Sequence, residues 1–132
     1  VVLALRYGAV RVVLTGDIGA AVEAEVAQVI AAIEQDEPPA TLTVLKVAHH
    51  GSAGASTAPL LALLRPSVAI VSSGAANPFG HPAPATLARL HDAGADVWRT
   101  DRDGEVTVSI NGAAIEVRGH TGRRRSVAAQ PR

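Results

Sequence analysis

Residues 41–52 read Thr-Leu-Thr-Val-Leu-Lys-Val-Ala-His-His-Gly-Ser, so that an apolar segment passes directly into a polar loop. The apolar part follows a proline pair and predicts a β-strand over residues 42–48. The loop then places two imidazoles at the end of that strand, followed by a glycine that lets backbone approach a ligand closely. This combination predicts a strand of an α/β sheet with chemically active side chains at its carboxyl end.

Upstream of this stretch, the pattern predicts a hairpin and then a helix. Strands are expected over residues 1–6 and 10–15, around a turn at Tyr7-Gly8-Ala9. A helix is expected over residues 20–35. Its inner face would hold Val22, Val26, Val29, Ile30 and Ile33, leaving Glu23, Glu25 and Glu34 in solvent. The chain opens at Val1 inside the first strand, which we interpret as the cut edge of a longer protein.

Downstream of the same stretch, helices and strands alternate. Short helices are expected after Thr57, a capping residue, and from Pro84, which can occupy a first helical turn. Strands are expected over residues 68–71, 96–99, 105–110 and 114–118. Residues 119–132 are polar, rich in arginine and without pattern, which predicts a disordered tail. The expected domain is therefore residues 1–118, a layered α/β arrangement with a mixed sheet.

Composition excludes several classes of protein and site. The 132 residues suit one compact domain with an aliphatic core, because the aromatic residues number only three. The absence of cysteine excludes disulfides and thiolate metal sites. Twelve basic and twelve acidic residues cancel, so no global field attracts nucleic acid. No apolar run approaches the roughly 20 residues of a membrane span, so the chain itself is expected to be soluble, without membrane contact.

Polar residues gather in three loops that each follow a predicted strand. These loops are Thr15-Gly16-Asp17, Ala48-His49-His50-Gly51-Ser52 and Asn77-Pro78-Phe79-Gly80-His81-Pro82. Ligand sites in open α/β sheets lie at the edge where strands end. One carboxylate and three imidazoles at that edge suit a divalent metal ion or a phosphate.

Each of these residues can also be explained without a functional site. Asp17 could simply cap the following helix. His49 and His50 could be one core and one surface histidine, and His81 could be a polar turn residue. His91 and His120 are expected on a helix surface and in the tail. The coincidence of three polar loops favours the site.

The three motifs together resemble the ComEC/Rec2 family of competence proteins, which are bacterial membrane proteins of DNA uptake. The segment Trp98-Arg99-Thr100-Asp101-Arg102-Asp103-Gly104 is similar to the turn that closes the family's hydrolase-like domain. The resemblance covers residues 1–118. It implies that the chain is the C-terminal half of a metallo-β-lactamase-type αββα sandwich, whose N-terminal half is missing here.

The resemblance also implies a role for each matching position. Asp17 corresponds to a carboxylate that bridges two divalent ions, zinc or manganese. One of His49 and His50 corresponds to a late histidine ligand, and Asp17 and His50 are the expected catalytic residues. The expected substrate-binding positions are Ser52, Asn77 and His81.

The implied activity is hydrolysis of DNA phosphodiesters by a metal-bound hydroxide. The parent protein would lie in the bacterial cell membrane, anchored by regions upstream, with this domain outside the cytoplasm. The chain lacks the superfamily's His-x-His-x-Asp-His motif, so alone it is expected to be inactive. Three alternatives stay open: a superfamily hydrolase of small phosphoesters, a non-catalytic structural module of a DNA channel, and an ordinary α/β binding protein.

Overall fold

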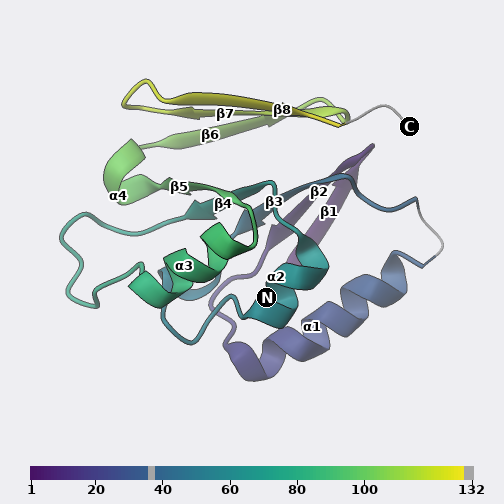
Figure 1. Ribbon diagram of the computed structural model, residues 1–132, viewed down its shortest axis with the longest axis horizontal. Helices are drawn as coiled ribbons and strands as arrows, with labels where there is room; N and C mark the ends of the chain where they lie inside the picture. Colours follow the sequence, from purple (N-terminus) through teal and green to yellow (C-terminus); the bar gives the residue numbers. More distant parts are fainter. Residues whose placement is uncertain (36–37, 130–132) are drawn as a thin grey trace.

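The chain forms two β-sheets that lie face to face. A computed structural model describes residues 1–35 and 38–129 (Figure 1). The larger sheet has the order β1-β2-β3-β4-β5. Its strands are β1 (Leu3–Tyr7), β2 (Val10–Leu14), β3 (Leu42–Lys46), β4 (Val68–Val71) and β5 (Asp96–Arg99). Only β1 runs antiparallel to its neighbour, so the predicted α/β fold with a mixed sheet is confirmed.

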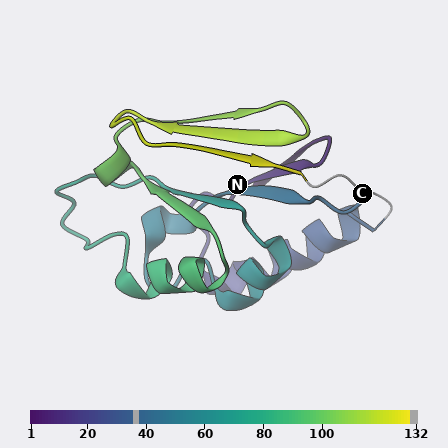
Figure 2. The same ribbon diagram turned by 45° about the horizontal axis from the view of Figure 1, so that its top comes forward.

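Helices cover one face of the larger sheet and the smaller sheet covers the other, which gives three layers (Figures 1 and 2). The helices of the outer layer are α1 (Ala20–Ile33), α2 (Ala58–Leu64) and α3 (Pro84–Asp92). The smaller sheet is antiparallel and contains β6 (Val106–Ile110), β7 (Ala114–Gly119) and β8 (Arg124–Ala128). Two short helical turns, η1 (Ala48–Gly51) and α4 (Thr100–Asp103), follow β3 and β5.

Each of the two spaces between layers holds its own apolar cluster. Between the helices and the sheet lie Val13, Leu45, Leu60, Leu64 and Leu90, among others. Between the two sheets, Trp98 is fully buried with Val44, Val68, Ile115 and Val117. Strands β3 and β4 contribute to both clusters, as expected for strands covered on both faces.

The exposure predicted for Glu23 is wrong. Its side chain is only 1% exposed and accepts hydrogen bonds from Thr57 N (2.8 Å), Thr57 Oγ1 (2.6 Å) and Ser56 N. Helix α1 is therefore turned so that Glu23 faces the start of α2, and the predicted inner residues Val22, Val29 and Ile33 are 43%, 53% and 65% exposed. The Thr57 hydroxyl, predicted as a helix cap, binds Glu23 instead and makes no cap hydrogen bond.

The disordered tail predicted for residues 119–132 is also wrong over β8, since this strand pairs with β7 along its whole length. Val127 lies opposite Ile115 and packs against the cluster between the sheets. The Arg123 guanidinium lies 3.9 Å from the centre of the Trp98 ring and also bonds Asp96. Buried apolar area and this cation–π contact order the segment. Residues 130–132 of the predicted tail lie outside the described residues.

Across the part of the chain that the structure describes, every helix is too short or too polar to cross a lipid bilayer.

Candidate functional site

The three polar loops meet at one edge of the larger sheet, because β2, β3 and β4 run parallel and end there. Main-chain and hydroxyl groups join the loops directly. His49 N donates to Gly16 O at 3.0 Å, and Thr15 Oγ1 donates to Lys46 O at 2.6 Å. The predicted convergence of Asp17, the histidine pair and His81 at one edge is confirmed.

His49 and His50 both lie in the left-handed region of backbone conformation, with φ of 48° and 54°. A residue with a Cβ atom pays roughly 1–3 kcal/mol for such a backbone, so the surroundings must hold it there. Gly51 supplies part of that support. Its φ is +82°, and its carbonyl accepts a hydrogen bond from Ala83 N at 2.8 Å. A Cβ atom at this glycine would lie 2.6 Å from Pro82 Cβ, so two neighbouring loops are packed against each other here.

His50 turns one ring nitrogen toward Asp17 and the other toward a backbone carbonyl. Its Nδ1 lies 2.8 Å from Ser72 O, and because a carbonyl only accepts, this nitrogen carries the hydrogen of the neutral ring. The other nitrogen, Nε2, lies 3.6 Å from Asp17 Oδ1, and in the neutral ring it is an acceptor. Two facing acceptors are stable together only with a cation or a proton between them. Backbone orientation of one nitrogen is also how proteins fix metal-binding histidines.

The donor types and their separation suit a divalent cation, but the number of donors does not complete a site. Two ligand atoms that are each about 2.0–2.1 Å from a tetrahedral zinc lie about 3.4 Å apart, close to the observed separation. Within residues 1–35 and 38–129, however, no group of three or more His, Cys, Asp or Glu side chains could hold a metal ion. Asp17 and His50 are thus two candidate ligands, whereas a structural or catalytic zinc takes at least three from protein.

The geometry separates the two histidines. His50 lies beside Asp17, whereas the His49 ring lies edge-on to His81, with 5.9 Å between ring centres and a 73° angle between planes. His50 is therefore the better candidate for the ligand that sequence alone leaves open. The capping alternative for Asp17 fails, because α1 begins after Gly19 and no side chain caps it.

The loop after β4 is held by Asn77. The Asn77 amide accepts from His81 N (3.0 Å) and donates to His81 O (2.6 Å) and Gly74 O (2.8 Å). The Asn77 side chain therefore holds His81 in position. The sequence had suggested a different role for Asn77, direct contact with the substrate. Phe79, between them, is 77% exposed, and its ring centre lies 5.9 Å from that of His81. The sequence analysis assigned no role to Phe79. The position of the chain's single phenylalanine in a polar loop could have drawn attention to it.

Helix α4 supports the base of the same loop. Ser73 N donates to Thr100 Oγ1 at 2.9 Å, and that hydroxyl donates to Ser73 O at 2.8 Å. Ser73 Oγ also donates to Asp101 Oδ1 at 3.3 Å. The hydrogen bond and charge of Arg99 lower the pKa of Asp101 below its ordinary 3.8, so the carboxylate that holds this corner stays ionised. The segment expected as a closing turn thus forms a support for the site loop.

Comparison with known proteins then identifies the family. The chain is 36% identical over 105 residues to ComE operon protein 3 of Bacillus subtilis and 34% identical over 116 residues to Recombination protein 2 of Haemophilus influenzae. Competence protein ComA of Neisseria gonorrhoeae is 33% identical over 73 residues. The chain belongs to the ComEC/Rec2 competence family. No protein family model and no solved structure matches it.

The similarity to these ComEC/Rec2 proteins covers most of the chain but little of the relatives. The matched segments take in 80% and 88% of this chain for the first two proteins, and 13% and 14% of their own lengths. For the gonococcal protein the shares are 55% and 11%. The matched region is therefore a small part of each competence protein.

Ser52 keeps its place beside the histidine pair through its backbone. Its amide donates to His49 O at 2.9 Å, and its carbonyl accepts from Thr86 Oγ1 at 2.7 Å. The histidines predicted to be incidental lie away from the three loops. His91 is exposed beside Asp92, with 3.7 Å between Nδ1 and Oδ1, and His120 is exposed in the turn between β7 and β8.

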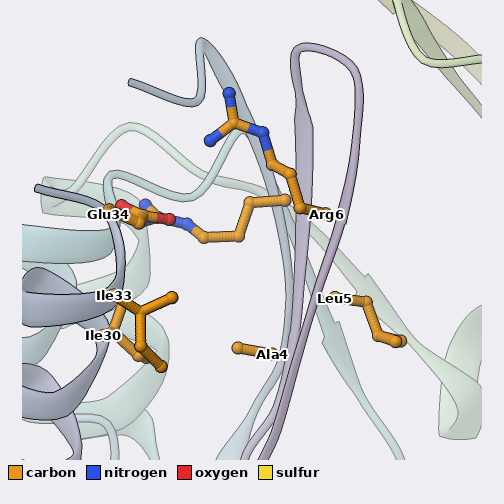
Figure 3. Close-up of a pocket in the computed structure, with 7 residues that line it drawn as sticks. Ala4, Leu5, Arg6, Ile30, Ile33 and Glu34 are labelled. Atoms are coloured by element: carbon orange, nitrogen blue, oxygen red, sulfur yellow. The ribbon is translucent and has the colours of Figure 1, made fainter. Parts of the chain in front are cut away.

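A groove of about 380 Å³ lies apart from the site, between β1 and α1 (Figure 3). Ala4, Leu5, Ile30 and Ile33 give it an apolar lining. Its charged side chains already have partners: Arg11 pairs with Glu34 within the lining at 2.6 Å, and Arg6 donates to Pro38 O. The groove therefore offers apolar surface without a reactive group.

Proposed function

We propose that this chain forms the C-terminal half of a metallo-β-lactamase-type domain that hydrolyses DNA phosphodiesters during bacterial DNA uptake. The observation that carries the proposal is the pair Asp17 and His50. Their acceptor atoms face each other at 3.6 Å on the carboxyl edge of a parallel sheet, and Ser72 O holds the histidine in the ligand tautomer. Membership of the ComEC/Rec2 family supplies the biological context.

The layers support this assignment of the fold. Helices α1, α2 and α3 cover the larger sheet, and the smaller sheet packs on its other face (Figures 1 and 2). An αββα sandwich needs a further helical layer on the outer face of the smaller sheet. We assign that layer, and the remaining metal ligands, to other parts of the parent protein.

The residues of this chain would have different roles at the site, some in binding metal and others in binding phosphate. Asp17 would supply negative charge to hold divalent cations, zinc or manganese, and His50 would supply a neutral nitrogen donor. Bound divalent ions lower the pKa of water and stabilise a phosphate leaving oxygen. His81, held by Asn77, and Ser52 lie on the neighbouring site loops and would serve as hydrogen-bonding groups for a phosphate. We place the parent protein in the cell membrane, with this domain on the outer side and DNA as its substrate.

The test is Asp17→Asn in the intact parent protein, with metal content measured by elemental analysis and hydrolysis measured on bis(p-nitrophenyl) phosphate. Asn keeps the size of the side chain and removes its charge. If Asp17 bridges cations, metal affinity should fall about tenfold or more, and hydrolysis should fall with it.

The chain contains a matched control, because Asp92 and His91 form an exposed pair with a similar separation, 3.7 Å, on α3. Asp92→Asn should leave metal content and hydrolysis unchanged. Equal metal content and equal hydrolysis in Asp17→Asn and the unaltered protein would refute the metal site. A parent protein that binds no metal at all would instead favour a structural module.

A further inference from the structure

We infer that Phe79, with His81 beside it, is a stacking platform for an unpaired nucleobase, so that the site edge binds single-stranded DNA in preference to duplex. This inference rests on the proposed function, because it assigns the form of the nucleic acid that the same edge receives. It makes Phe79 a residue that selects the substrate without taking part in bond cleavage.

The exposure of Phe79 is the first observation. Burying a phenylalanine side chain stabilises a protein by about 1.5–3 kcal/mol, yet this ring is 77% exposed. The chain has one Phe, one Tyr and one Trp, and the Trp is fully buried in the core. One of its few aromatic rings thus stands in solvent on the loop that contains His81.

The loop that holds this ring is fixed at both ends. Asn77 joins its tip through hydrogen bonds to Gly74 and His81. Its base is bound to α4 through Ser73, and its far end is bound to Gly51 O through Ala83 N. A ring on a fixed loop loses little conformational entropy when a ligand stacks on it, because the backbone is already ordered.

Neighbouring rings connect Phe79 with the histidine pair of the site. Phe79 and His81 lie 5.9 Å apart with their planes tilted by 30°, and His81 lies 5.9 Å from His49. His49 immediately precedes His50, which faces Asp17. A base stacked on Phe79 would therefore lie on the same group of loops as the Asp17 and His50 pair.

The stacking geometry decides between the two forms of DNA. In a duplex the faces of the bases are covered by their neighbours, so a protein ring can stack only on a base that has left the helix. Stacking of a base on an aromatic side chain contributes about 1–3 kcal/mol and tolerates any sequence. An exposed ring therefore favours single strands of any sequence.

The experiment measures binding of the 132-residue chain to a fluorescein-labelled twelve-nucleotide oligothymidylate and to a duplex of equal length, by fluorescence anisotropy at fixed salt. Phe79→Leu keeps an apolar side chain and removes the ring, and Phe79→Trp keeps a ring. We expect Phe79→Leu to weaken single-strand binding about tenfold with duplex binding unchanged, and Phe79→Trp to bind the single strand at least as tightly as the unaltered chain. Tyr7→Leu, which removes a 57% exposed ring at the opposite edge of the sheet, should change neither.

The outcomes separate this inference from the proposed function. Unchanged single-strand binding in Phe79→Leu, or an equal loss in Tyr7→Leu, would overturn the stacking platform and leave the metal site standing. An unaltered chain that binds neither single strand nor duplex would also overturn the platform, whereas the metal site is tested separately by Asp17→Asn in the parent protein.

Discussion

Glu23 offers the sharpest test of the packing that supports the site. The change is Glu23→Gln, which keeps the shape of a buried side chain and replaces one carboxylate oxygen by an amino group. In the structure both oxygens only accept, one from Ser56 N and the other from Thr57 N and Thr57 Oγ1. The amide must therefore turn its amino group toward at least one of these donors.

The expected loss follows from the hydrogen bonds that fail. A hydrogen bond to a charged group contributes about 1.5–3 kcal/mol, and a buried donor left without a partner costs about 1–3 kcal/mol. One such failure, with weakening of the others to neutral strength, gives a loss of about 3 kcal/mol. For a domain of 132 residues this corresponds to a fall of about 10 °C in the midpoint of thermal unfolding.

The assay is urea unfolding followed by circular dichroism, together with thermal unfolding, of the unaltered chain and the variant. Glu25→Gln on the same helix is the matched control, because Glu25 is exposed, and its free energy of unfolding should change by less than about 0.5 kcal/mol. A loss below about 1 kcal/mol in Glu23→Gln would refute the assignment of Glu23 as the buried link between α1 and α2.

Two further predictions concern the loops of the site. Gly51→Ala should lower the free energy of unfolding by about 2–4 kcal/mol, since its Cβ would lie 2.6 Å from Pro82 Cβ at a φ of +82°. Gly54→Ala is the control, because there is open space around Gly54. An equal loss in both variants would contradict the close packing at Gly51. Because Arg99 lowers the pKa of Asp101 below 3.8, the stabilisation should be complete above about pH 4 and lost as pH falls through the lowered pKa. Asp101→Asn should therefore be less stable than the unaltered chain at pH 6 and approach it at pH 2 to 3 in thermal unfolding, and a pH-independent difference would argue against the ion pair.

Periodicity and turn residues predicted most elements of this fold, because the information that they need is local. The strands at 68–71 and 96–99 were predicted at their observed bounds, since a short apolar run limits a strand on both sides. The meeting of three loops at one edge followed from strand direction alone. These features require no knowledge of which distant side chain lies opposite.

The errors arose where a distant partner decides the outcome. A helical pattern places glutamate on the outer face, and nothing local shows that the start of α2 offers three donors to Glu23. The run of arginines at residues 123–125 suggested a disordered tail, whereas β8 is ordered by Val127 and by the contact of Arg123 with Trp98. The choice between His49 and His50 depends on left-handed backbone and on Ser72 O, which lies 22 residues beyond His50 in the sequence.

Strand β1 has a consequence for handling the chain. It is the edge strand of its sheet, all five of its residues are exposed, and Leu3, Leu5 and Tyr7 are 51%, 55% and 57% exposed. An exposed, apolar edge with unpaired backbone groups is a template for strands from other molecules. Concentrated solutions of the chain will therefore form intermolecular β-structure and precipitate. Dilution, or a lysine introduced in place of Leu5, is the remedy, because added charge makes such an edge a poor partner for its own copies.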